Sequence, residues 1–80
     1  MTQDNWKHLT IVVNPHTAPY RASAWVSWST EDNCFIAICP AFKHVSAHGD
    51  TEIEAVNELR IALTGVLEVY HAEGWELPTT

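Results

Sequence analysis

Histidines are the residues whose number and spacing first suggest chemistry, since the chain holds five of them in 80 residues. His44 and His48 are four apart in a segment that reads as a strand, so they share a face and could ligate a metal ion. A third ligand would have to come from elsewhere, from His16 or His71. Ordinary surface histidines explain the same residues more simply. We therefore expect neither a bound metal ion nor any other cofactor.

The two cysteines, Cys34 and Cys39, are the other reactive side chains. They lie five apart in one predicted strand, so they point to opposite faces and cannot bridge each other. Small core hydrophobes are a simpler interpretation than nucleophiles. Two unpaired thiols fit a reducing compartment better than a secreted disulfide scaffold, which predicts a cytoplasmic protein. The chain has no serine in a nucleophile-elbow pattern and no glycine-rich loop that could cradle a phosphate.

Carboxylates could hold divalent cations for hydrolysis, a chemistry that needs several acids converging on two metal ions. Four of them fall in predicted ends and turns: Asp4, Glu31, Asp32 and Asp50. Three more share the polar side of a predicted helix and read as a solvated face: Glu54, Glu58 and Glu68. No predicted strand interior adds an acidic residue. We therefore predict that the chain is not an enzyme, and keep a metal-assisted hydrolase only as a third hypothesis.

Composition and charge describe one small acidic domain, residues 1–80. Hydrophobic residues make up 46% of the chain and charged residues 18%, a balance typical of globular proteins. The net charge of −6 disfavours direct binding to nucleic acid and favours a basic protein partner. The chain has no run of about 18 apolar residues. Its N-terminus lacks the apolar stretch of a signal peptide, so no membrane association is expected.

The elements that would position these side chains begin with strands. Four segments have the alternation or the apolar character of strands: 8–13, 21–29, 34–39 and 43–48. Residues 30–33 suit a hairpin turn, in which Asn33 can take a left-handed backbone. Pro40 ends the third strand, because proline cannot donate to a ladder. The sequence leaves open whether the first strand joins its own sheet or a neighbour's.

A single long helix is predicted over residues 51 to 73. Gly49 allows the chain to turn into it. Thr51 and Glu54 have the spacing of a capping box. The apolar positions span roughly 160° of the helix surface, wide enough to cover a small sheet. Gly74 ends the helix.

The expected fold class is α+β, a three- to four-stranded antiparallel sheet with one long helix packed on one face. Residues 75–78 are predicted to return as a short edge strand, which gives the order β-β-β-β-α-β. Trp25 and Trp28 fall on opposite faces of their strand, so one tryptophan stays on the face that the helix does not cover. Ile61 points away from the apolar stripe of the helix. Such exposed apolar groups often mark an interface, and we expect a homodimer or higher homo-oligomer.

Two stretches of the chain resemble the HicB antitoxin family. They read AWVSWSTEDNCFIAICPAF, at residues 24–42, and SAHGDTEIEAVNELRIALTGVLEVYHAEGWELP, at residues 46–78. The matching features are an acidic turn, an aromatic-led strand ending in proline, a Gly-Asp-Thr before the helix, and a closing glycine and proline. They are carried by Glu31, Asp32, Phe35, Pro40, Gly49, Asp50, Thr51, Glu54, Ala55, Gly74 and Pro78. The family-like core is 21–79, and residues 1–20 are an N-terminal extension with an additional strand near 8–13.

The resemblance implies a partial ribonuclease H-like fold and a role as an antitoxin. Proteins of this family neutralise HicA, a small basic toxin that cleaves messenger RNA. A charge of −6 suits such a partner and would speed their encounter. Many members continue into a DNA-binding domain. Because this chain stops at Thr80, we do not expect it to repress its own operon.

Two functions stay open. The first is a HicB-like antitoxin that acts through a sheet edge and the acidic helix. Its contacts are predicted to come from Trp25, Asp32, Glu54, Glu58 and Ile61. The second is a stand-alone, self-associating domain with no toxin partner, an adaptor or a domain of unknown role, with Trp25 or Ile61 buried between copies. Five further residues are predicted to be structural: Pro40, Gly49, Asp50, Thr51 and Gly74.

Overall fold

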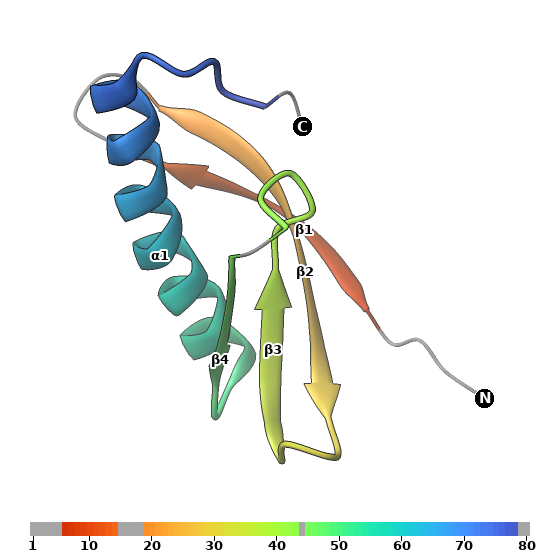
Figure 1. Ribbon diagram of the computed structural model, residues 1–80. Helices are drawn as coiled ribbons and strands as arrows, with labels where there is room; N and C mark the ends of the chain where they lie inside the picture. Colours follow the sequence, from red (N-terminus) through yellow and green to blue (C-terminus); the bar gives the residue numbers. More distant parts are fainter. Residues whose placement is uncertain (1–5, 15–18, 44, 79–80) are drawn as a thin grey trace.

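Four strands and one helix follow one another along the chain (Figure 1). The structure is a computed structural model that describes residues 6–14, 19–43 and 45–78. The elements are β1 (Lys7–Val13), β2 (Tyr20–Ser29), β3 (Cys34–Ile38), β4 (Ser46–Gly49) and α1 (Glu52–Glu73). The predicted α+β class, an antiparallel sheet with one long helix, is confirmed.

The strands form one antiparallel sheet in the order β1-β2-β3-β4, so each strand pairs with the next along the chain. β1 pairs with β2 over its whole length, from Lys7 opposite Val26 to Val13 opposite Tyr20. The question left open by the sequence is thereby answered, because the first strand completes its own sheet.

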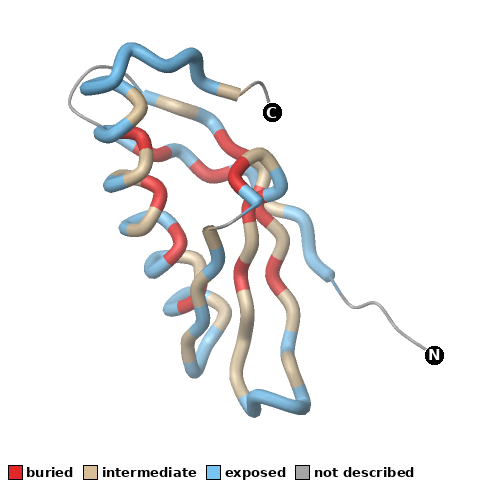
Figure 2. Tube along the Cα trace, viewed as in Figure 1, coloured by how far each residue is buried: buried red, intermediate tan, exposed pale blue. Residues whose placement is uncertain are grey.

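The core lies between α1 and one face of the sheet. Figure 2 shows the buried residues of the helix and of the strands in red. β2 contributes every second residue, as its alternating pattern predicts. The helix contributes residues spaced four apart along one stripe. The buried apolar residues are Ile11, Val13, Ala22, Ala24, Val26, Ala37, Cys39, Phe42, Ala55, Leu59, Leu63 and Leu67. Small alanines on the strands let the larger leucines of the helix approach closely.

Local signals fix the β2–β3 turn and both ends of α1. Asn33 adopts the left-handed backbone, with a φ of 56°. The Thr51 hydroxyl accepts a hydrogen bond from the Glu54 amide at 3.0 Å. The Glu54 carboxylate reaches back and accepts one from the Asp50 amide at 2.8 Å, which completes the predicted cap. Gly74 ends the helix with a φ of 73°.

Gly49 has a different role from the predicted one. It is the last residue of β4, and its backbone is not in the left-handed region. A Cβ built on Gly49 would lie 2.6 Å from the Glu54 Cβ and 2.7 Å from the Ala55 nitrogen. The missing side chain is therefore needed for the close approach of the first helical turn to the strand, rather than for backbone freedom.

The β3–β4 connection shortens both flanking strands relative to their predicted bounds. The Phe42 amide donates to the Cys39 carbonyl and the Val45 amide to the Phe42 carbonyl, each at 2.9 Å. The first of these turns contains Pro40, and Phe42, which belongs to both, is buried in the core. β4 therefore begins at Ser46 instead of residue 43.

The predicted edge strand at 75–78 is wrong, because the structure assigns no strand to these residues. The Trp75 amide donates to the Tyr70 carbonyl at 2.9 Å, and its ring packs edge-on against Tyr70 at 5.2 Å. The Tyr20 hydroxyl donates to the Pro78 carbonyl at 2.8 Å. Side-chain packing and these two hydrogen bonds hold the segment in place of a ladder. Within the described part of the chain, no helix is long and apolar enough to cross a membrane.

Candidate protein-binding surface

The sheet has one face covered by α1 and one face that no described element covers (Figure 1). We call the second the open face. Strand register sets its side chains side by side in two central rows, His8–Trp25–Ile38–Ser46 and Ser27–Ile36–His48. Apolar side chains thus lie in the middle of the open face, with hydroxyl and imidazole groups around them.

Trp25 lies at the centre of the open face, so it is the tryptophan that the helix does not cover, a choice that the sequence left open. The His8 ring is 4.6 Å from its ring, measured between centroids. Ile38 lies opposite it on β3, and Trp6 and Pro40 line the same shallow depression. These neighbours leave Trp25 partly buried.

Carboxylates are segregated from the sheet. The four strands contain no aspartate or glutamate at all. The acidic residues in the described part of the chain lie in the β2–β3 turn, the β4–α1 junction, α1 and the residues after it. An acidic protein therefore presents a sheet without negative charge.

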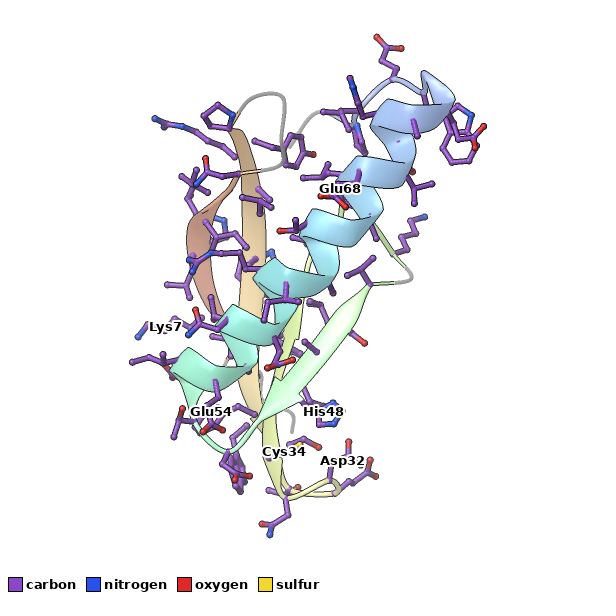
Figure 3. All side chains as sticks on the ribbon, turned by 90° about the vertical axis from the view of Figure 1, so that its left-hand side faces the viewer. Lys7, Asp32, Cys34, His48, Glu54 and Glu68 are labelled. Carbon is purple, nitrogen blue, oxygen red and sulfur yellow. The ribbon has the colours of Figure 1, made fainter. Side chains whose placement is uncertain are left out.

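Five carboxylates gather at one end of the molecule, which we call the acidic end: Glu31, Asp32, Asp50, Glu52 and Glu54. The β2–β3 turn and the start of α1 both lie at the lower end in Figure 1 (Figure 1). Asp32 and Glu54, from these two segments, lie at the same end in the side-chain view (Figure 3). Strand pairing produces this arrangement, because Phe35 at the start of β3 lies opposite Gly49 at the end of β4.

Polar contacts order the two segments of the acidic end separately, one within the β2–β3 turn and one between β1 and α1. The Ser29 hydroxyl accepts from the Asp32 amide at 3.1 Å and lies 3.3 Å from the Asp32 carboxylate. The Lys7 ammonium is 3.4 Å from a Glu52 carboxylate oxygen. Both partners of this ion pair are about half exposed, so its contribution to stability is small, roughly 0.2–1 kcal/mol.

Two large apolar side chains border the acidic end. Trp28 is 44% exposed and packs edge-on against Phe35 at 5.0 Å, and Ile53 is 73% exposed. Trp28 is on the helix side of the sheet, but α1 begins beside Gly49 and leaves it uncovered. The alternating pattern places Trp28 on the same face as Ala24 and Val26 but left open which face the helix covers. The start of the helix directly after β4 is the signal that Trp28 would remain exposed.

The five predicted contact residues do not form one site. Asp32 and Glu54 lie at the acidic end, where Glu54 also caps the helix. Glu58 and Ile61 are exposed on α1, and Ile61 is 64% exposed. Trp25 lies on the open face of the sheet, on the other side of the molecule from the exposed side of α1.

The histidines that the structure describes do not belong to any cluster of metal ligands. In residues 6–14, 19–43 and 45–78, no three His, Cys, Asp or Glu side chains are placed to hold a metal ion. His48 lines a shallow hollow with Asp32 and Cys34 (Figure 3). His16 and His44, two of the ligands considered from the sequence, lie outside the described residues.

The two thiols have different environments. Cys39 is buried, and this burial raises the pKa of its thiol above the usual 9.0, partly offset by backbone hydrogen bonds from Ala41 and Phe42. Cys34 was also predicted to be a core residue, and this prediction is wrong, because it lies on the open face and is partly exposed. A thiol that stays neutral is a poor nucleophile, so Cys39 is a core residue as the sequence predicts.

Comparison with protein-family models, with curated proteins and with solved structures finds no match to this chain.

Proposed function

We propose that the protein is a HicB-like antitoxin domain that binds and neutralises a small basic, mRNA-cleaving toxin of the HicA type. The observation that carries the proposal is the acidic end, where turn and helix start bring five carboxylates together. An isolated acidic surface attracts a basic protein and speeds its encounter.

The acidic end also offers apolar contact, which charge alone does not supply. Trp28 and Ile53 are large, exposed and next to the carboxylates. Tryptophan is among the residues that contribute most to binding when a partner removes them from water. In the proposed complex these two side chains are the anchors, and the carboxylates around them select a basic partner.

The fold is compatible with the resemblance. Strands β2, β3 and β4 followed by α1 have the order of the family-like core, and we propose that this unit corresponds to a partial ribonuclease H-like fold. β1 is an addition to that pattern. The Gly49-Asp50-Thr51 motif supports the proposal, since it is the segment that brings the helix start against the sheet.

The test is affinity capture from the native host. The tagged protein is expected to retain one small basic protein, identified by mass spectrometry. Co-expression of that protein with this chain should then relieve the growth arrest that it causes alone. Recovery of no such protein, or arrest that persists on co-expression, contradicts the proposal.

A matched pair of variants tests the surface. Glu31→Lys combined with Asp50→Lys reverses charge at the acidic end, where neither side chain caps the helix. Glu73→Lys combined with Glu76→Lys makes the same change in net charge at the end of α1 and just after it. Capture should be lost with the first pair and kept with the second. Equal loss with both would show that only net charge matters.

A second candidate function is a self-associating domain with no toxin partner, an adaptor or a domain of another role. It is favoured by the open face, whose central tryptophan and isoleucines carry no negative charge that would repel another copy. Capture of no basic partner, together with a stable homo-oligomer in solution, would decide for it.

A further inference from the structure

The outer edge of β1 is the long free edge of the sheet. β1 has β2 on one side and no described strand on the other. The opposite edge strand, β4, has only four residues and packs against α1, whereas β1 has seven. Exposed backbone groups on such an edge can pair with another strand.

β1 lacks the features that usually protect an edge. Its register with β2 is continuous, so it has no bulge. It contains no proline, and its single lysine, Lys7, is at its first position and turned toward Glu52. Three β-branched residues end the strand, and Val12 is 41% exposed. The edge is therefore available and has high β propensity.

The charge distribution favours a second copy of this chain as the partner that pairs with the β1 edge. A protein of net charge −6 repels itself over most approaches. β1 and its neighbour β2 carry no carboxylate, and their permanent charges are the cations Lys7 and Arg21. As far as the described residues go, the β1 edge is thus a place where two copies meet without bringing carboxylates together.

We propose that two copies pair through antiparallel β1 strands about a two-fold axis at Thr10. This register places Leu9 opposite Ile11 of the second copy, and His8 opposite its Val12. Helix-side residues then meet helix-side residues, and open-face residues meet open-face residues, as the period of two in a strand requires. Seven residues on each side allow roughly six to eight hydrogen bonds between the backbones.

The resulting sheet has eight strands, with both helices on one face and both open faces joined on the other. Val12 of one copy lies beside His8 of the other, and His8 lies beside Trp25 of its own copy. The rows of side chains on the open face therefore extend across the dimer. The helix starts and the β2–β3 turns take no part in the pairing. This dimer does not depend on the proposed toxin, and each copy keeps its acidic end free for a basic partner.

The first test is mass in solution, by native mass spectrometry and light scattering. The unmodified protein should have twice the 9.0 kDa mass of one chain. Val12→Lys places two lysines in the pairing edge and should raise the dimer dissociation constant at least tenfold, with an unchanged circular dichroism spectrum. A monomeric unmodified protein at 100 µM, about the level of a weak complex, overturns the proposal.

The second test needs only a mild substitution. In a Cys34→Ser background, Thr10→Cys places two thiols opposite each other at the two-fold axis. Opposed residues in antiparallel strands have Cα atoms about 4.5–5.5 Å apart, within disulfide range. Ser23→Cys, one strand inward on the same face, is the control. Oxidation should cross-link the first variant and leave the second unlinked, and the reverse result would indicate face-to-face packing and overturn the edge pairing.

Discussion

Two glycines of the chain show how differently single residues act in this fold. Gly49 faces the first turn of α1, where an added Cβ would lie 2.6 Å from the Glu54 Cβ. Gly65 is inside α1, and an added Cβ there would meet nothing within 4 Å. One glycine is required by packing, and the other only weakens the helix.

We therefore expect opposite effects of the same substitution at these positions. Gly49→Ala should lower the free energy of unfolding by about 1–3 kcal/mol, because the helix start must shift. Gly65→Ala should raise it by about 0.5–1 kcal/mol, because alanine favours the helix. Urea unfolding followed by circular dichroism measures both. A Gly49→Ala protein as stable as the unmodified one would refute the close approach described for this site.

Cys39 and Tyr20 predict how stability depends on alkaline pH. Burial raises the pKa of the Cys39 thiol above 9.0 and that of the Tyr20 phenol above 10.0. In the unfolded chain both groups lose their protons at lower pH than in the folded protein. Their contribution to stability is therefore complete below the unfolded pKa and is lost as the pH rises through the raised value.

The midpoint temperature of thermal unfolding should accordingly decrease as the pH rises from about 8.5 to about 11, the range in which thiols and phenols ionise. Cys39→Ala and Tyr20→Phe each remove one titrating group, so the slope of midpoint against pH should be shallower for each variant, whatever its midpoint at pH 7. If the slopes of all three proteins are the same, these groups do not control the pH dependence.

At the scale of elements, α1 has two sides with separate roles. Leu63 is fully buried against the sheet, whereas Ile61, two residues earlier, is 64% exposed. Leu63→Ala should lower the free energy of unfolding by about 2–5 kcal/mol, since it leaves a cavity in a thin core. Ile61→Ala should change it by no more than about 0.5 kcal/mol. Chemical denaturation of the two variants tests this, and similar losses would mean that Ile61 is also packed.

The elements that sequence alone predicts are those specified by neighbouring residues. Asn33 in the turn, Thr51 and Glu54 at the helix start, and Gly74 at its end follow from bonds within one turn of chain. The alternation in β2 likewise predicts that Ala22, Ala24 and Val26 share one face. These features were confirmed because no distant residue decides them.

Other features depend on contacts between distant segments, and the sequence pattern does not contain them. Residues 75–78 read as a strand, but Trp75 packs on Tyr70 and the Tyr20 hydroxyl binds Pro78. The exposure of Trp28 depends on where α1 begins above the sheet. The acidic end arises only when the β2–β3 turn and the helix start meet. The sequence therefore names residues of the candidate site, such as Asp32 and Glu54, but does not show that they come together at one end of the molecule.

For the whole molecule, the two proposals use different surfaces. In residues 6–14, 19–43 and 45–78 the carboxylates lie on the β2–β3 turn, the helix and its flanks, whereas the strands carry none. Pairing through β1 would leave both acidic ends exposed. A dimer of this kind can bind two basic proteins at once, so the expected complex contains two copies of each chain.

Calorimetric titration of the captured basic partner is the measurement that most directly tests contact through the acidic end. Affinity for the unmodified protein should fall at least tenfold as salt rises from about 50 to 300 mM, because screening shortens the range of the charges. The variant with lysine in place of Glu31 and Asp50 should bind at least tenfold more weakly at low salt. The control variant, with lysine in place of Glu73 and Glu76, should bind nearly as well as the unmodified protein. Binding that is independent of salt, or equally tight with lysines at the acidic end, would contradict the account.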